Sequence, residues 1–329
     1  MCRLNLMAGR RARDSAAYAP AANFLRTGLE FLPADPWRAE PELTRVYGIR
    51  VLLYSHQAEQ NAAIESGLEC LRLYGLEVNL QGIKPELIRQ DKIIRQKMRG
   101  RDPAELSSLP AMDDEESIAL VEILSAIAAA SYIGNSARSA LVVMYGVVLS
   151  LDKGNAPFSP YHYASYGSFL TTLGQYESAY AFATAALELV HANDISRIQC
   201  RVLHLVSLAV SHWRTHARNN IQLSSEGRRT SLESGDMTYA GFSIVVLNLI
   251  KFQLSQPLAE LHMESARDRD FLEQLGHGDA RRIVSIVTQK CAALLGHTDE
   301  PTSFSNAELS EAKLTADLEA GEAPAALHI

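Results

Sequence analysis

The chain has 329 residues, of which 47% are hydrophobic, and its 31 Lys and Arg residues face 38 Asp and Glu residues, which gives a net charge of −7. So much apolar material excludes a wholly disordered protein and suffices for one elongated domain or two compact ones. Because no cationic surplus is left to neutralise a phosphate backbone, we expect no nucleic-acid binding.

The spacing of the cysteines and the lengths of the apolar runs indicate the cellular environment in which the chain folds. Cys2, Cys70, Cys200 and Cys291 lie at least 68 residues apart, which excludes paired zinc-site spacings and dense disulfide frameworks. We therefore expect a reducing, cytoplasmic environment. The longest apolar runs, 118–133 and 141–151, are shorter than the roughly 20 residues that span a bilayer, so no membrane partner is expected. The Arg-rich N-terminus only weakly resembles a transit peptide in composition.

Apolar residues recur at steps of three and four along almost the whole chain, which predicts helices of about 12 to 20 residues. The expected breaks between helices are Pro33 to Pro36, Gly75, Gly100 to Pro103, Pro110 to Asp113, Gly134-Asn135, Gly154 to Pro160, Gly174, Gly235-Asp236, Gly276 to Gly278 and Gly296. Runs of alternating β-branched and aromatic residues, which would predict strands, are missing. The sequence therefore predicts an all-α protein.

One helix start is well marked. Asp113 and Asp114 precede an apolar-periodic run from Ser117 to Ile133, and acidic residues favour the positive end of a helix. Gly134 then ends the predicted helix.

The clearest pattern, between residues 163 and 190, is that of two antiparallel helices joined by a tight turn. Large residues form the packing face of the first helix, a Gly-x-Tyr turn reverses the chain, and small residues let the second helix approach closely. The residues of this pattern are Tyr163, Tyr166, Gly167, Leu173, Gly174, Tyr176, Ala179, Phe182, Ala186 and Leu187. Their spacing resembles a tetratricopeptide hairpin.

The second-helix half of this pattern recurs from Ala21 and Ala63 as well as from Ala179. A small residue is followed seven positions later by another small residue and Leu, which an Ala-rich and Leu-rich amphipathic helix can also offer by chance. The copies lie 42 and 116 residues apart, and neither is a multiple of the tetratricopeptide period of about 34 residues. We expect an irregular α-solenoid, with N-terminal hairpins at 1–110, the main array at 111–296 and a polar tail at 297–329.

Strings spread along the chain resemble the helical region of large hybrid signalling proteins of fungi and bacteria. They are AYAPAANFLRTGLEFLPADPW (17–37), GLECLRLYG (67–75), LPAMDD (109–114), GN (154–155) with YASYG (163–167), HWRTH (212–216) and ESGDMTYA (233–240). In that family a Ser/Thr-kinase-like domain and a P-loop ATPase precede the helical region, and a GAF domain and a histidine kinase follow it. The resemblance spans residues 5–296, follows the family's order, and implies that this chain is the helical region alone.

Two departures from the family bear on this interpretation. Only residues 38–62 connect Trp37 to Ala63, where the family carries at least one further hairpin. The pattern also begins inside a predicted helix and fades after Gly296. We interpret the chain as a fragment, a truncated gene product or a divergent remnant of such a protein.

None of the family's chemistry is expected in this chain. The sequence contains no Walker A motif, no kinase glycine-rich loop and no His-Arg-Asp catalytic string. The acids from Asp113 to Glu116, with Asn193 to Ser196, only distantly resemble the magnesium motifs of all-α terpene synthases. Magnesium bridging would need a carboxylate at position 117, which is Ser, and Ser196 falls one residue short of the usual spacing, so a helix cap is the preferred interpretation. We expect no cofactor, no metal and no catalytic residue.

A candidate contact surface lies at His212, Trp213, His216 and Arg218. His212 and His216 would share one helix face, a spacing that can bind a metal, but no third ligand is evident. We instead expect Trp213 to pack against a neighbouring helix while the others face solvent or a partner.

The sequence therefore predicts a non-catalytic scaffold or relay module of a two-component signalling protein. Its partners would be neighbouring kinase, ATPase or GAF domains, or a peptide ligand. Two alternatives remain open: an all-α enzyme with an unrecognised site, and a remnant without independent function. The oligomeric state is not predicted.

Overall fold

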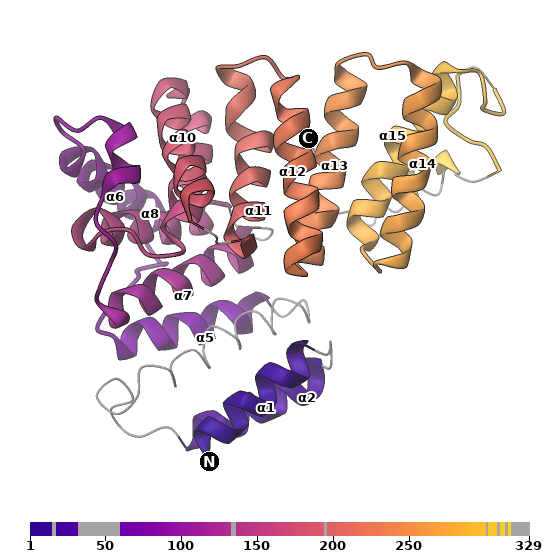
Figure 1. Ribbon diagram of the computed structural model, residues 1–329. Helices are drawn as coiled ribbons and strands as arrows, with labels where there is room; N and C mark the ends of the chain where they lie inside the picture. The colour runs from indigo at the N-terminus through magenta and orange to yellow at the C-terminus, as the bar shows by residue number, and fades with distance from the viewer. Residues whose placement is uncertain are drawn as a thin grey trace. The chain divides into compact units, whose positions relative to one another are not determined.

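The computed structural model describes residues 1–14, 18–31, 60–132, 136–193, 196–300, 302–307, 310–312 and 315–316 (Figure 1). Within these residues all regular elements are helices, and the extended backbone forms only an isolated bridge between Ala111 and Asn155. The all-α prediction is confirmed. Of the predicted breaks, Pro33 to Pro36 and Gly134-Asn135 lie outside the described residues. No helix in the described part of the chain is long and apolar enough to cross a membrane.

The chain divides into two compact units, one of Met1–Leu173 with Thr184–Leu189 and one of Gly174–Ala183 with Val190–Ile329. The helices up to Thr172 are α1 (Cys2–Asp14), α2 (Tyr18–Glu30), α5 (Gln60–Leu73), α6 (Ile83–Lys97), the 3₁₀ turn η2 (Pro103–Ser108), α7 (Glu115–Tyr132), α8 (Ser136–Lys153) and α9 (Ser159–Thr172). The helices that follow are α10 (Tyr176–Ala192), α11 (Ser196–Leu205), α12 (Asn219–Ser234), α13 (Met237–Gln253), α14 (Leu258–Gln274) and α15 (Gly278–Leu294).

Small residues let α1 and α2 pack closely. Leu6 and Leu25 form their shared core with the fully buried Ala21. A Cβ atom on Gly9 would lie 2.8 Å from a Leu25 methyl carbon, and one on Gly28 would lie 3.3 Å from the Cβ of Asn5. A side chain at Gly9 would require Leu25 to move, and one at Gly28 would fit only tightly, which agrees with the prediction that small residues let these helices approach closely.

The centre of the first unit is built from α7, α8 and α9, with α5 contacting α7 and α6 contacting α8. His162 of α9 is fully buried, and its Nε2 lies 3.0 Å from the Val121 carbonyl oxygen of α7. Its ring occupies the space left by Gly146 of α8. Burial lowers the pKa of His162 to about 4, so the imidazole is neutral at pH 7. It is a core residue and does not meet a helix end.

Polar contacts join α6 to the helices beside it. Tyr145 donates a 2.7 Å hydrogen bond to Glu86, and Tyr166, which is almost fully buried, donates one of the same length to Asp91. Hydrogen bonding from Arg89 lowers the pKa of Glu86 to about 2, so the carboxylate stays ionised and keeps accepting. These contacts fix the rotation of α6 on the unit.

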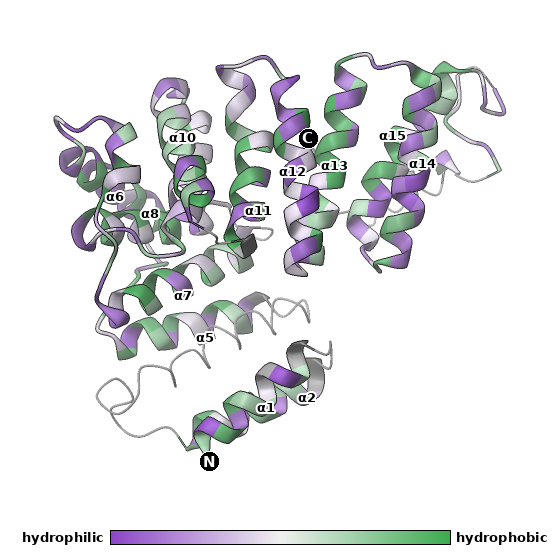
Figure 2. Cartoon of the chain, viewed as in Figure 1, coloured by the Kyte–Doolittle hydropathy of each residue, from purple (hydrophilic) through white to green (hydrophobic). Residues whose placement is uncertain are grey.

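The second unit is a row of antiparallel hairpins. Each helix from α11 to α15 contacts the next one along the chain, and α13 also contacts α11 and α15 (Figure 1). α13 is apolar along most of its length, whereas α12 and α14 carry more polar residues (Figure 2). Because α13 contacts four other helices, it forms the core of the unit. Ile244 of α13 and Val284 of α15 belong to one apolar cluster, and both side chains are fully buried.

Helix ends follow the signals in the sequence. Asp114 accepts hydrogen bonds from the Glu116 amide at 3.1 Å and the Ser117 hydroxyl at 2.6 Å, and α7 begins at Glu115, two residues before the predicted start. Gly174 has φ +70° and separates α9 from α10 at the predicted turn. A side chain would be strained in this left-handed conformation, so glycine is required.

Candidate interaction surface

The chain leaves α11 through irregular turns that present an aromatic residue to solvent. After Leu205, α11 continues as a π-helical turn over Val206–Val210 and a 3₁₀ turn over Ser211–Trp213. The side chain of Thr215 donates to the Ser211 carbonyl at 3.0 Å, which closes the bend before α12 begins at Asn219. π-Helical turns are rare and occur frequently at functional sites.

Trp213 is 49% exposed, and its ring contacts the side chains of neighbouring aromatic residues. Its ring stacks on Tyr176, the first residue of α10, with ring centroids 4.5 Å apart and an interplanar angle of 14°. The ring centroid of His212 lies 5.2 Å from that of Trp213, and Arg214 forms an ion pair with Glu177. The exposed residues of this region with Tyr176 are here named the Trp213 surface: Tyr176, Glu177, His212, Trp213, Arg214, His216 and Arg218.

The predicted candidate residues are brought together in part. Trp213 packs on a neighbouring helix while His212, His216 and Arg218 are exposed, as expected. The prediction that His212 and His216 share one helix face is wrong, because the helix ends at Trp213 and His216 lies in the following bend. There, Nδ1 of His216 accepts a 3.1 Å hydrogen bond from the Arg218 amide. No group of three potential metal ligands occurs among the described residues.

The Trp213 surface is aromatic and carries two arginines, Arg214 and Arg218, against one acid, Glu177. The segment 195–225 contains no Asp or Glu, so the acidic balance of the whole chain does not hold here. Partial burial lowers the pKa of His212, which keeps it neutral at pH 7. The ion pair of Arg214 with Glu177 is exposed and contributes little to stability, so either partner can exchange it for another contact.

The residues of the predicted tetratricopeptide hairpin are mostly buried. Tyr163, Tyr166, Ala179, Phe182 and Ala186 are at most 4% exposed, in agreement with a packing role. Leu173 differs, since it is 49% exposed next to the Gly174 turn. Tyr176 is half-buried and also carries the contact with Trp213, which residue spacing alone did not indicate because 37 positions separate the two.

A second cluster joins α11 to α13 and escaped sequence analysis. Arg201 pairs with Asp236 at 3.0 Å and lies over the ring of Tyr239 at 5.1 Å. His204 stacks on Phe242 with centroids 5.4 Å apart, and burial lowers its pKa to about 4. Asp236 also accepts from the Tyr239 amide as the cap of α13, so this cluster is a structural joint between two helices.

The thiols in the described helices are poor nucleophiles. All four cysteines are buried, and burial raises the pKa of Cys200 to about 11 and also raises that of Cys291. A thiol with a raised pKa remains protonated at pH 7. Cys200 and Cys291 are therefore core residues of their helices.

Comparison with known proteins gives no relationship from which a function can be transferred: no family model matches the chain, and no curated protein matches it. The assignment of function therefore rests on the residues and geometry described above.

Proposed function

We propose that the chain is a non-catalytic helical-repeat scaffold that binds a protein partner through the Trp213 surface. The support for a repeat array is a regular spacing in the second unit. The helices α11, α13 and α15 begin 41 residues apart, at Ser196, Met237 and Gly278, and each contacts the next of the three. This is the contact pattern of stacked hairpins, in which each repeat packs on its neighbour.

The burial pattern supports the same interpretation. Positions 41 residues apart share an environment: Ser207, Asn248 and Gln289 are at most 5% exposed, and Ser224 of α12 and Ser265 of α14 are fully buried. Ser207, Asn248 and Gln289 differ in type, so at this position the repeat is one of burial, whereas Ser224 and Ser265 also keep the residue type. The spacing is longer than the tetratricopeptide period of about 34 residues and nearer to the longer helical repeats of about 40 residues. We propose an array of such longer hairpins.

The exposed tryptophan is the observation that carries the binding proposal. Trp, Tyr and Arg dominate the energetics of protein interfaces, and here all three meet at one surface. A helical scaffold gains nothing in folding by leaving half of a Trp side chain in water, whereas a partner would bury it. Arg214 and Arg218 outnumber Glu177, the one acid of this surface, which favours an acidic partner segment that contains an aromatic or apolar residue.

The resemblance to hybrid sensor histidine kinases supports a proposal for the kind of protein in which this scaffold acts. We propose that it acts in a cytoplasmic two-component signalling protein, where it contacts kinase, ATPase or GAF domains. The array would transmit conformational changes between these domains or recruit partner proteins, and it would catalyse no reaction itself.

The binding proposal is testable by fluorescence. Trp37 and Trp213 are the two tryptophans, so Trp37→Phe leaves Trp213 as the reporter. Two synthetic peptides of equal length, one rich in Glu and Tyr and one rich in Lys and Tyr, are titrated against this protein. We expect a saturable change in Trp213 emission with the acidic peptide only, weakened by salt.

Binding is then measured with labelled acidic peptide. Trp213→Ala is expected to weaken it at least tenfold, as for a residue at the centre of an interface. Tyr132→Ala is the matched control, because Tyr132 is an aromatic residue on α7 that is 58% exposed, against 49% for Trp213. Equal binding of both peptides, or equal loss in both variants, contradicts the proposal.

A further inference from the structure

Charge is unevenly distributed along the first unit. Residues 84–101 contain seven Lys and Arg residues and two acids, although the whole chain has a net charge of −7. Residues 102–116, which follow directly, contain six acids and no Lys, Arg or His. A strongly cationic segment is therefore joined to a strongly acidic one.

Most of these cations lie on the side of α6 that faces away from the unit. Gln90 and Ile94 are the buried residues of this helix. At about 100° per residue, the opposite side carries a line of residues that are all exposed, the last of them in the turn after the helix. They are here named the α6 row: Lys84, Ile88, Lys92, Arg95 and Arg99.

The acids of α6 do not neutralise the α6 row. Glu86 and Asp91 each form an ion pair of 2.6 Å with an arginine of the same helix, so their charges are already compensated. Three cations of the row form no ion pair with any residue that the structure describes: Lys84, Lys92 and Arg99. The row is thus cationic, with one apolar side chain, Ile88, between its two lysines.

The segment 102–116, here named the acidic segment, is equally uncompensated. Its exposed acids, none of which forms an ion pair within the described part of the chain, are Asp102, Glu105, Asp113, Glu115 and Glu116. Pro110 and Ala111 lie between the two groups of acids and are exposed as well. The acidic segment therefore repeats the arrangement of the α6 row with the opposite sign: charges on both sides of an apolar centre.

Both surfaces are held at the C-terminal end of α8. Lys97 of α6 forms an ion pair with Asp152 of that helix. The side chain of Asn155 donates a 2.8 Å hydrogen bond to the Leu106 carbonyl, and the Asn155 amide donates one of the same length to the Pro110 carbonyl. The acidic segment is thus fixed close to the end of α6, and its exposed acids still do not pair with the row.

This arrangement selects among anionic partners. A membrane surface or a nucleic acid presents negative charge over a wide area, so it would meet the acidic segment together with the α6 row and be repelled by it. A second copy of the chain presents both signs of charge. A two-fold axis between two copies would place each row against the acidic segment of the other copy.

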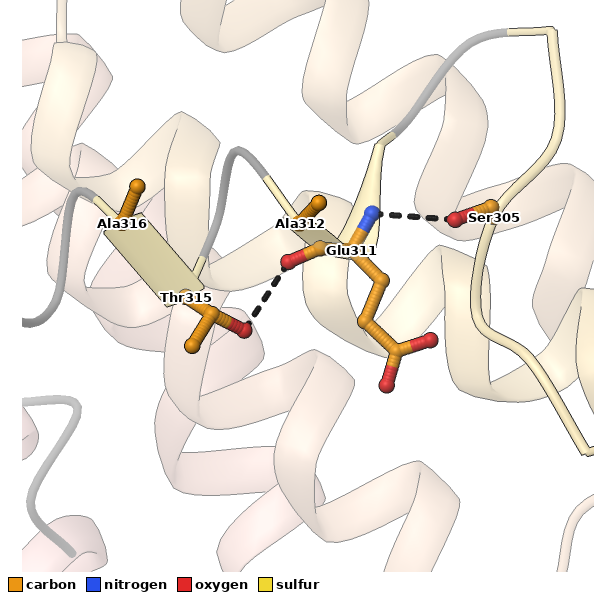
Figure 3. A pocket seen from close by; sticks show the side chains of 5 residues that line it. All are labelled: Ser305, Glu311, Ala312, Thr315 and Ala316. Carbon is orange, nitrogen blue, oxygen red and sulfur yellow. Dashed lines mark hydrogen bonds between the residues drawn. The ribbon is translucent and has the colours of Figure 1, made fainter.

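The hollow near the C-terminal end offers no comparable site. It lies among Ser305, Glu311, Ala312, Thr315 and Ala316 (Figure 3). The Glu311 amide donates to the Ser305 hydroxyl at 3.1 Å, and the Thr315 hydroxyl donates to the Glu311 carbonyl at 3.0 Å. The Glu311 carboxylate accepts from the Phe304 amide at 3.0 Å. The polar groups that line this hollow are therefore satisfied within their own segment.

We propose that the α6 row docks the acidic segment of a second copy of this chain, and that two such contacts form a two-fold dimer. Ion pairs between exposed side chains contribute little individually, so the dimer is weak and depends on salt. The Trp213 surface contributes no residue to either contact, and the two proposals therefore stand or fall separately.

The first test exchanges the charges. Lys84→Glu with Lys92→Glu reverses the α6 row, and Glu105→Lys with Asp113→Lys reverses the acidic segment; all four side chains are exposed. In analytical ultracentrifugation the parent protein should dimerise at about 50 mM salt and dissociate at about 500 mM salt. Each double variant alone should dimerise about tenfold more weakly, because like charges then meet in both contacts. An equimolar mixture of the two variants should dimerise as the parent does, because both contacts again join opposite charges.

Arg72→Glu with Arg267→Glu is the matched control, because it changes the net charge equally at exposed arginines of α5 and α14. It should leave the dimer unchanged. A parent that stays monomeric at low salt, a dimer that reversal of the α6 row leaves intact, or a mixture that does not associate overturns the proposal. A monomeric parent that binds phosphatidylserine vesicles or duplex RNA through the row overturns it too and assigns the row to that partner.

The second test needs no variant. A carbodiimide couples a lysine amine directly to a carboxylate that it contacts. Equal amounts of chains with natural and with heavy nitrogen are mixed, coupled and digested for mass spectrometry. We expect cross-links from Lys84 or Lys92 to residues 102–116 that join one light and one heavy peptide, reduced about fivefold at high salt. Cross-links found only within unmixed pairs, or none between these segments, refute the dimer.

Discussion

The contact between Gly146 and His162 provides the sharpest test of how the first unit is packed. A Cβ atom on Gly146 would lie well under 3.0 Å from three ring atoms of His162. His162 is fully buried and bonded to the Val121 carbonyl, so its ring has no free space to enter. In Gly146→Ala either the ring leaves its position or α8 and α9 move apart.

The expected cost follows from three contributions. Overpacking a core costs about 1–3 kcal/mol, and losing the hydrogen bond to Val121 costs about 1 kcal/mol. Against these, replacing Gly by Ala inside a helix stabilises it by up to about 1 kcal/mol. We therefore expect Gly146→Ala to lower the free energy of unfolding by about 2 kcal/mol.

The assay is urea unfolding followed by circular dichroism, with hydrogen exchange of α8 and α9 assigning the change to the first unit. Gly278→Ala is the matched control, because nothing lies within 4 Å of a Cβ atom at that position. Its stability should change by no more than a few tenths of a kcal/mol. The double variant Gly146→Ala with His162→Ala should lose less than the sum of the single losses, since the clash is absent. A Gly146→Ala protein as stable as the parent would refute this reasoning.

Three further predictions concern protonation, capping and a buried tyrosine. His162 has a pKa of about 4 in the folded protein and about 6.5 in the unfolded chain, so the unfolded state binds more protons between these pH values. The free energy of unfolding should therefore fall by about 3 kcal/mol as the pH drops from 6.5 to 4, and His204 should add to this loss. A urea midpoint that stays constant over this pH range would contradict the prediction. Asp114→Ala removes the cap of α7 and should lower the free energy of unfolding by about 1 kcal/mol, measured by thermal unfolding. An unchanged stability would show that the cap does not stabilise α7. Tyr166→Phe removes the bond to Asp91 and should cost about 1–2 kcal/mol by the same measurement, and a neutral result would argue against a tight α6 contact.

Much of the fold could be predicted because its signals are local. Helix periodicity, the capping aspartate at position 114 and the turn at Gly174 each depend on a few neighbouring residues, and the structure confirms them. The burial of Ala21, Ala63 and Ala179 also agrees with the small-residue pattern. These features need no knowledge of which helices meet.

The remainder depends on contacts between distant segments. The 41-residue repeat escaped detection because Ser207, Asn248 and Gln289 share burial and not residue type. The stacking of Trp213 on Tyr176 likewise has no signature in the sequence. The interpretation of His212 and His216 as one helix face failed because hydrophobic periodicity did not reveal that the helix ends at Trp213, before His216.

The π-helical turn has a consequence for how this protein could be altered. Such a turn contains one residue more than the α-helical path it replaces, so removing a residue between Val206 and Val210 would rewind the segment as ordinary α-helix. Five residues at the π-helical spacing turn the chain through about the same angle as four residues at the α-helical spacing of about 100° per residue, so the residues after the deletion would keep nearly the same direction. A single-codon deletion in this turn should therefore leave Trp213 stacked on Tyr176, whereas the same deletion in the regular part of α11 would rotate everything after it.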